Sequence, residues 1–210
     1  DPSIMANCGF PVIPEYLNKR RFPSDAISEA NVTHVWTQSK LLSKKIAKAC
    51  FIENIVEDYR DMIDKVDGIL LARDDSENHY EMSKPFLLSG LPIYIDKPLS
   101  TKVENAKKIL NLQKYSGQVF TCSALAYAEE FRIKREELQT IGKIISIEGI
   151  APNKWEKYSV HVIEPMLNLV PHRGEIIKKR NSLGWKLVST STAVVDTSNQ
   201  FSNLYLFWEK

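Results

Sequence analysis

The tripeptide Asp96-Lys97-Pro98 directly follows a short apolar run at residues 93–95, which predicts a buried strand. An ammonium group held at a strand end in a partly dry cleft can have its pKa lowered, or can hydrogen-bond the oxygen of a reacting hydroxyl. Lys97 is therefore a candidate for proton transfer to or from a substrate. The alternative is a surface turn, and the surrounding elements decide between the two.

Strands and helices alternate along the first part of the chain. Strands are predicted at 32–37, 68–72, 93–95 and 118–125, and helices at 39–50, 53–63, 79–90 and 101–117. The strand at 68–72 is expected to be buried on both faces, as at the centre of a parallel sheet. The predicted fold class is α/β, a Rossmann-like doubly wound parallel sheet, in which ligands bind beyond the carboxyl ends of the strands.

The pattern changes after residue 142. Longer strand-like segments at 143–152, 184–198 and 200–210 flank a helix at 160–170, which predicts an α+β domain with an open, mainly antiparallel sheet. We expect a dinucleotide-binding domain at 1–124, whose first strand can be missing, and an α+β substrate and dimerisation domain at 125–210, which can be incomplete. An open sheet face commonly packs against another subunit, so a homo-oligomer is expected, although a core strand explains the apolar ending equally well.

The stretch from Val66 to Ser100 resembles a known family. Its sequence, VDGILLARDDSENHYEMSKPFLLSGLPIYIDKPLS, is similar to the pattern DAVxIATPNxxH…ALxxGKHVxxEKPLA of the glucose-fructose oxidoreductase and myo-inositol dehydrogenase (Gfo/Idh/MocA) family. The order of elements follows that family from about Val32 to Pro171. The resemblance implies an NAD(P)-dependent dehydrogenase that transfers hydride between nicotinamide and a CH–OH carbon of a sugar, polyol or related small molecule, with NADP or NAD as cofactor.

The resemblance also assigns catalytic roles. It places Lys97 beside the nicotinamide and the substrate, with a cis peptide before Pro98 and with Asp96 in place of a glutamate. His161, which opens an HxxE pattern with Glu164, corresponds to a histidine that binds the substrate or acts as an acid–base partner. A structural histidine is the alternative for His161.

Three residues are candidate substrate contacts. Glu164 belongs to the HxxE pattern. Lys157 stands where the family has an aspartate. This replacement removes a carboxylate that orients the imidazole, and it brings a second cation near Lys97. Tyr127 follows the last strand of the first domain and can stack on or hydrogen-bond a ligand, although a half-buried aromatic is the commoner outcome.

The cofactor candidates follow the predicted strands: Thr37, Ser39, Lys40, Arg73, Asp74, His79, Asp96 and Pro98. No acidic residue follows the strand at 32–37, and a serine and a lysine there are compatible with the 2′-phosphate of NADP; the alternative is no nucleotide contact. For His79 the alternative is packing at a helix N-terminus.

The phosphate-binding fingerprint GxGxxG is absent from the sequence. Either its strand and loop precede Asp1, or the phosphate site has decayed. Together with Lys157 and the missing ribose acid, this absence also fits a catalytically degenerate homologue that senses a ligand or binds a protein.

Composition excludes several classes of partner. With 28 basic and 26 acidic residues, the net charge of +2 is too even for a nucleic-acid or anionic-membrane surface. No apolar run approaches the roughly 20 residues of a membrane span. Three widely spaced cysteines form no CxxC pair, so no metal site is expected, and reduced thiols indicate a cytoplasmic protein.

Overall fold

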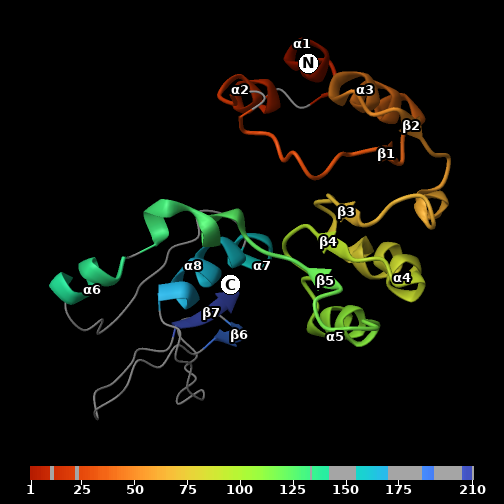
Figure 1. Ribbon diagram of the computed structural model, residues 1–210. Coiled ribbons are helices and arrows are strands. Elements are labelled where there is room, and N and C mark those ends of the chain that lie inside the picture. The colour runs from red at the N-terminus through yellow and green to blue at the C-terminus, as the bar shows by residue number, and fades with distance from the viewer. Residues whose placement is uncertain are drawn as a thin grey trace. The chain divides into compact units, whose positions relative to one another are not determined.

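The structure is a computed structural model that describes residues 1–9, 12–21, 24–132, 134–141, 155–169, 186–191 and 205–209 (Figure 1). The chain divides into two compact units. The first comprises Asp1–Ile69 and Pro85–Pro92, and the second comprises Leu70–Lys84 and Ile93–Lys210. The predicted domain boundary between residues 124 and 125 stays a prediction.

The first unit contains a parallel β–α–β arrangement. Its elements are α1 (Pro2–Ala6), α2 (Ile13–Asn18), β1 (His34–Val35), α3 (Lys40–Cys50), β2 (Asn54–Ile55) and η1 (Tyr59–Met62). β1 and β2 pair in parallel, with His34 opposite Asn54. Helix α3 begins after Ser39, whose side chain accepts a hydrogen bond from the backbone N–H of Leu42, and it ends at Phe51 in the left-handed conformation.

The prediction of a helix at 53–63 is wrong. The segment forms β2 and then the single 3-10 turn η1, because the backbone N–H groups of Asn54 and Val56 donate to carbonyls of the 33–35 segment. Asp58 and Asp61 then close a capping box around η1. Pairing with a distant strand has overridden the local helical periodicity.

The second unit contains a three-stranded sheet in the order β3-β4-β5. The elements of this region are β3 (Ile69–Leu71), η2 (Ser76–Asn78), α4 (His79–Ser89), β4 (Ile93–Ile95), α5 (Val103–Asn111) and β5 (Val119–Phe120). Of these, Ile69 and the end of α4 from Pro85 belong to the first unit. β4 and β5 are parallel, and Asp96 N donates to Leu71 O at 3.0 Å. The alternation of strands and helices predicted for residues 68–125 is confirmed.

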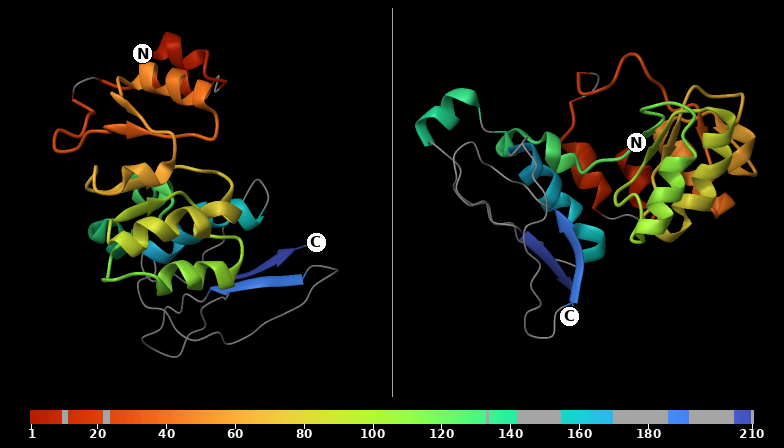
Figure 2. Two further views of the ribbon diagram at one scale, coloured as in Figure 1. Left: turned by 90° about the vertical axis from the view of Figure 1, so that its right-hand side faces the viewer. Right: turned by 90° about the horizontal axis from the view of Figure 1, so that it is seen from below.

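One face of this sheet is partly exposed. Leu71, Ile93 and Ile95 are buried, whereas Leu70 is 67% and Phe120 51% exposed. Successive side chains of a strand point to opposite faces, and α4 and α5 lie along one side of the sheet (Figures 1 and 2). The expectation that residues 68–72 are buried on both faces is therefore wrong at Leu70.

The second unit continues with short helices and one strand pair. The elements are η3 (Ala124–Tyr127), η4 (Glu129–Phe131), α6 (Arg135–Ile141), α7 (Trp155–Tyr158), α8 (Val160–Leu169), β6 (Lys186–Ser191) and β7 (Tyr205–Glu209). β6 and β7 pair antiparallel, with Ser191 opposite Tyr205. The strand predicted at 143–152 lies outside the described residues, so the open sheet of this region stays a prediction. No helix in the described ranges is long and apolar enough to cross a membrane.

Candidate active site

The ends of β3 and β4 are joined by a buried histidine. His79 is fully buried at the start of α4, and its Nε2 and Nδ1 lie 3.0 Å from Arg73 O and 3.2 Å from Leu99 O. Both ring nitrogens therefore face backbone carbonyls. This geometry supports the packing alternative for His79: the ring fixes the loop after β3 against the loop that carries Lys97.

The loop after β4 presents the candidate lysine. The Lys97-Pro98 peptide is cis, as the family resemblance implies. Lys97 Nζ lies 3.4 Å from Asp96 Oδ2, and the two side chains are 24% and 27% exposed. The ammonium group is thus partly withdrawn from water while a ligand can still approach it.

Ser123, three residues after β5, holds helix α8 at this end of the sheet. Its Oγ lies 2.7 Å from His161 Nδ1, and its backbone N–H donates to Glu164 Oε2. The Asn168 side chain adds a hydrogen bond to Ala126 O at 2.9 Å. These contacts bring both residues of the HxxE pattern to the carboxyl end of β5, the neighbour of β4.

Burial and charge tune the groups around Lys97. The pKa of His161 is lowered, first by burial and second by the positive charge of Lys97, while the Asp96 carboxylate opposes the shift. Burial raises the pKa of Glu164, and the hydrogen bond from the Ser123 N–H partly offsets this. The pKa of His161 thus depends in part on the charge of Lys97, the other candidate catalytic group.

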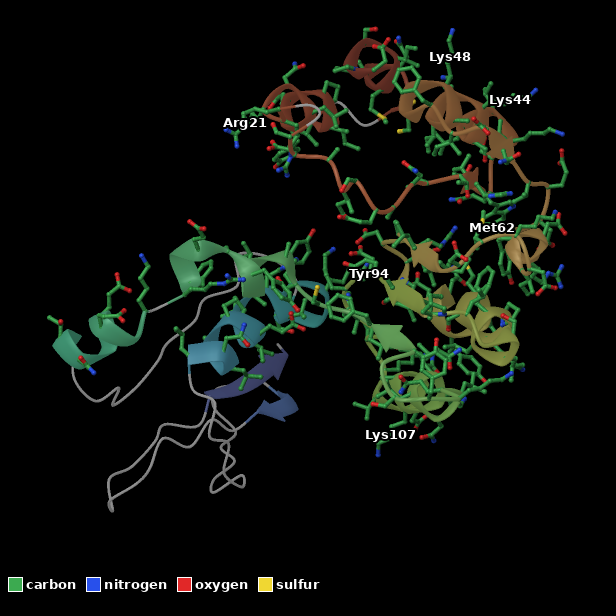
Figure 3. The ribbon with its side chains drawn as sticks, in the orientation of Figure 1. Arg21, Lys44, Lys48, Met62, Tyr94 and Lys107 are labelled. Atoms are coloured by element: carbon green, nitrogen blue, oxygen red, sulfur yellow. The ribbon has the colours of Figure 1, made fainter. Side chains whose placement is uncertain are left out.

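Two further residues belong to this cluster, and the sequence reasoning missed them as site residues. Tyr94 on β4 (Figure 3) and Cys122 after β5 each affect the pKa of the other, so their side chains lie close together. Burial is the main cause that raises the pKa of each, and the carboxylates of Asp96 and Glu164 act in the same direction. The sequence holds no signal for either residue as a site residue, because Tyr94 and Cys122 both lie within predicted strands, at 93–95 and 118–125.

The candidate substrate residues differ in their surroundings. Lys157 Nζ donates to Asp74 O at 3.1 Å and lies 3.8 Å from Asp74 Oδ2, so the second cation is paired at the end of β3. Tyr127, in η3, is 53% exposed. Glu164 is held by Ser123, as described above.

The candidates near β1 serve local structure in the first unit. Ser39 caps α3, and Thr37 Oγ1 donates to Ser39 O at 2.8 Å. Lys40 forms an ion pair with Glu57. Each polar group therefore already has a partner within its own unit.

The loop after β3 fits a bound dinucleotide. Arg73 forms a two-point ion pair with Asp75, and Asn78 Nδ2 donates to Asp75 Oδ2 at 2.6 Å. Next to them, Ser76 Oγ is buried without a hydrogen-bond partner, the one such side-chain atom in the described ranges. Since buried hydroxyls are normally paired, this unpaired group fits a polar ligand at the sheet edge where Rossmann folds bind dinucleotides.

A glycine-rich phosphate turn between a strand and a helix is absent from the described residues that precede β1, where the elements are α1 and α2. Nor do the described residues contain a group of three or more His, Cys, Asp or Glu side chains that can hold a metal ion. Among the described residues, those that fit a bound dinucleotide therefore lie in the loops after β3 and β4.

Comparison with known proteins agrees with this geometry. Residues 13–123, more than half of the chain, match the family model described as an oxidoreductase family with an NAD-binding Rossmann fold, GFO_IDH_MocA. A comparison with curated proteins gives no match.

Several solved structures are similar at low identity. An oxidoreductase from Thermotoga maritima has a TM-score of 0.50 and 18% identity over 64% of this chain and 50% of its own. Myo-inositol 2-dehydrogenase from Lactobacillus plantarum has a TM-score of 0.49 and 20% identity, with 58% and 38% covered. Scyllo-inositol dehydrogenase from Lactobacillus casei has a TM-score of 0.48 and 16% identity, with the same coverage. The chain thus spans half or less of the length of these proteins.

The family match carries the assignment, because it covers the strands and loops that hold the site as far as Ser123. The predicted Rossmann fold and the nicotinamide dinucleotide cofactor class are confirmed at the level of this family. The chain belongs to the Gfo/Idh/MocA oxidoreductase family, with its NAD-binding Rossmann fold.

Proposed function

We propose that the protein is an NAD(P)-dependent dehydrogenase that oxidises a carbinol carbon of a sugar, polyol or related small molecule to a carbonyl, or catalyses the reverse reaction. The carbinol C–H leaves as hydride, and the hydroxyl proton leaves to a protein base. When bound, the nicotinamide supplies the redox chemistry by accepting or returning the hydride. The observation that carries the proposal is that Lys97 follows the end of β4, while Ser123 holds His161 at the end of the neighbouring strand β5.

Lys97 and His161 have different roles at the hydroxyl oxygen of the substrate. Lys97 Nζ handles the hydroxyl proton or polarises the developing carbonyl, and His161 orients the same oxygen. Asp96 Oδ2 lies 3.4 Å from Lys97 Nζ and helps to hold the Lys97 side chain at the end of β4. A partly buried position keeps bulk water from competing for these contacts.

The cofactor side is assigned to the loops that follow the strands. Ser76 Oγ binds a ribose or amide oxygen, with Arg73, Asp74 and the Asp96-Pro98 loop around it. The assignment of Ser39 and Lys40 to the 2′-phosphate of NADP stays a prediction from the sequence.

The test is reduction of NAD and NADP, followed at 340 nm, across a panel of polyols and sugars. Lys97→Met should lower kcat by about 100-fold or more, as for loss of an acid–base group. Lys107→Met, which removes an exposed lysine on α5 (Figure 3), is the matched control and should retain wild-type turnover. Equal turnover of wild type and Lys97→Met would overturn the role of Lys97.

A further inference from the structure

We propose that Ser123 is a positioning residue that holds His161 in the tautomer with its proton on Nε2, so that His161 donates a hydrogen bond to the substrate oxygen. The tautomer follows from hydrogen bonding within the protein. The part played at the substrate rests on the proposed function.

The first step concerns the hydroxyl group of Ser123. This residue is fully buried, and its Oγ accepts a hydrogen bond from the backbone N–H of Leu125 at 3.2 Å, which caps η3. A serine hydroxyl has one hydrogen to donate. The remaining contact of Oγ is His161 Nδ1 at 2.7 Å, so the hydrogen points to Nδ1.

The second step compares the two tautomers of the ring. If Ser123 donates to Nδ1, the neutral imidazole carries its proton on Nε2. If Nδ1 instead donates to Oγ, the hydroxyl becomes a double acceptor and its own hydrogen has no acceptor among the described residues. A buried donor without a partner costs about 1–3 kcal/mol. The contacts around Oγ therefore favour the Nε2–H tautomer.

The third step concerns the orientation of the ring. The backbone N–H of Ser123 binds Glu164, which lies three residues after His161 on the same face of α8. One residue at the end of β5 thus contacts both members of the HxxE pattern. This double attachment fixes the helix as well as the ring, and it leaves Nε2 without a hydrogen-bond partner among the described residues.

The consequence is a division of roles. An Nε2–H group donates to a hydroxyl or carbonyl oxygen and does not accept a proton from it. The carbinol proton then passes to Lys97 in its neutral amine form, while His161 positions the oxygen and stabilises charge that develops on it.

The test is long-range ¹H–¹⁵N correlation spectroscopy of protein labelled at its histidines. The chain has four histidines, and the His161 signals are identified by their loss in His161→Asn. At neutral pH we expect an unprotonated Nδ1 and a protonated Nε2. A protonated Nδ1 in the wild type overturns the proposal, and this outcome does not depend on the folding of any variant.

Variants then show whether Ser123 is the cause. Ser123→Ala should give a mixture of tautomers and lower kcat by about 10- to 100-fold, as for loss of other groups that orient a functional imidazole. Ser123→Thr keeps the hydroxyl and should restore the wild-type spectrum. Ser83→Ala, a buried serine of α4 whose Oγ donates to Tyr80 O, is the matched control. An unchanged tautomer in Ser123→Ala would contradict the proposal.

The NMR spectra can be recorded without enzymatic turnover. The positioning role of Ser123 and the proposed dehydrogenase function can therefore be contradicted independently of each other. The Nε2–H tautomer without hydride transfer contradicts the proposed function and leaves the positioning role of Ser123 intact. Hydride transfer with an Nδ1–H tautomer contradicts the positioning role of Ser123 and leaves the proposed function intact.

Discussion

Lys97 places a positive charge beside the His161 ring, and this charge is the second cause, after burial, of the lowered pKa of His161. Removing it in Lys97→Met should raise the pKa of His161, because the protonated ring no longer faces a like charge. The measurement is an NMR titration of the His161 ring. In Lys107→Met the pKa should stay at the wild-type value, and an unchanged or lower pKa in Lys97→Met would contradict the assigned proximity.

The sequence named Lys97, His161 and Glu164, but it did not connect Ser123 to them. Lys97 follows a strand that local apolar residues define, and the HxxE spacing is visible along one helix. The bond between Ser123 and His161 joins residues 38 positions apart, and Tyr94 and Cys122 come together from β4 and the segment after β5. Such contacts depend on tertiary packing, for which a single sequence without a pairing pattern holds no signal.

At the scale of elements, the Arg73–Asp75 pair fixes the loop after β3. The Arg73 guanidinium holds the pKa of Asp75 at about 2, below its ordinary value of 3.8, and Asn78 contributes a further hydrogen bond. A carboxyl group whose pKa is lower in the folded protein stabilises the fold at pH values above its ordinary pKa. This stability is lost as the pH falls through the pKa of the folded state. The loop that carries Ser76 therefore weakens in acid.

Asp75→Asn should lower the free energy of unfolding by about 1 kcal/mol at pH 7, because the pair is partly exposed and solvent screens it. The difference from wild type should shrink as the pH falls from about 4 toward 2. Urea unfolding at several pH values measures it. A difference that grows in acid would contradict the assigned ion pair.

Ser39 gives a second prediction at this scale. Ser39→Ala removes the side-chain cap of α3 and should lower the free energy of unfolding by about 1 kcal/mol. Ser116→Ala, at an exposed turn position, is the control and should change it by less than about 0.5 kcal/mol. Equal denaturation midpoints of the two variants would show that the cap contributes nothing.

Elements were predictable where local pattern and packing agree. The segment from β3 to β5 has apolar strands and helices of ordinary length, and both types were predicted there. Residues 53–63 were not, because the 3.6-residue periodicity favours a helix while pairing with β1 imposes an extended backbone. The exposure of Leu70 could not be foreseen either, since apolar composition does not say which faces of a sheet become covered.

At the scale of the whole molecule, we propose that the chain forms a homo-oligomer through the sheet that contains β6 and β7. Leu204, Leu206 and Trp208 alternate in the sequence, as expected for an apolar strand face. Leu206→Asp should therefore shift the protein to monomers in light scattering coupled to gel filtration. A monomeric wild-type protein would contradict the proposed assembly.

The most direct test of the account is transfer of deuterium from NADH and NADPH, each labelled with two deuterium atoms at nicotinamide C4, to a panel of keto-sugars and keto-polyols. We expect a product alcohol that gains one deuterium, seen by mass spectrometry, with the yield greatly reduced in Lys97→Met and retained in Lys107→Met. No deuterated product from either cofactor, or equal yields from wild type and Lys97→Met, would contradict it.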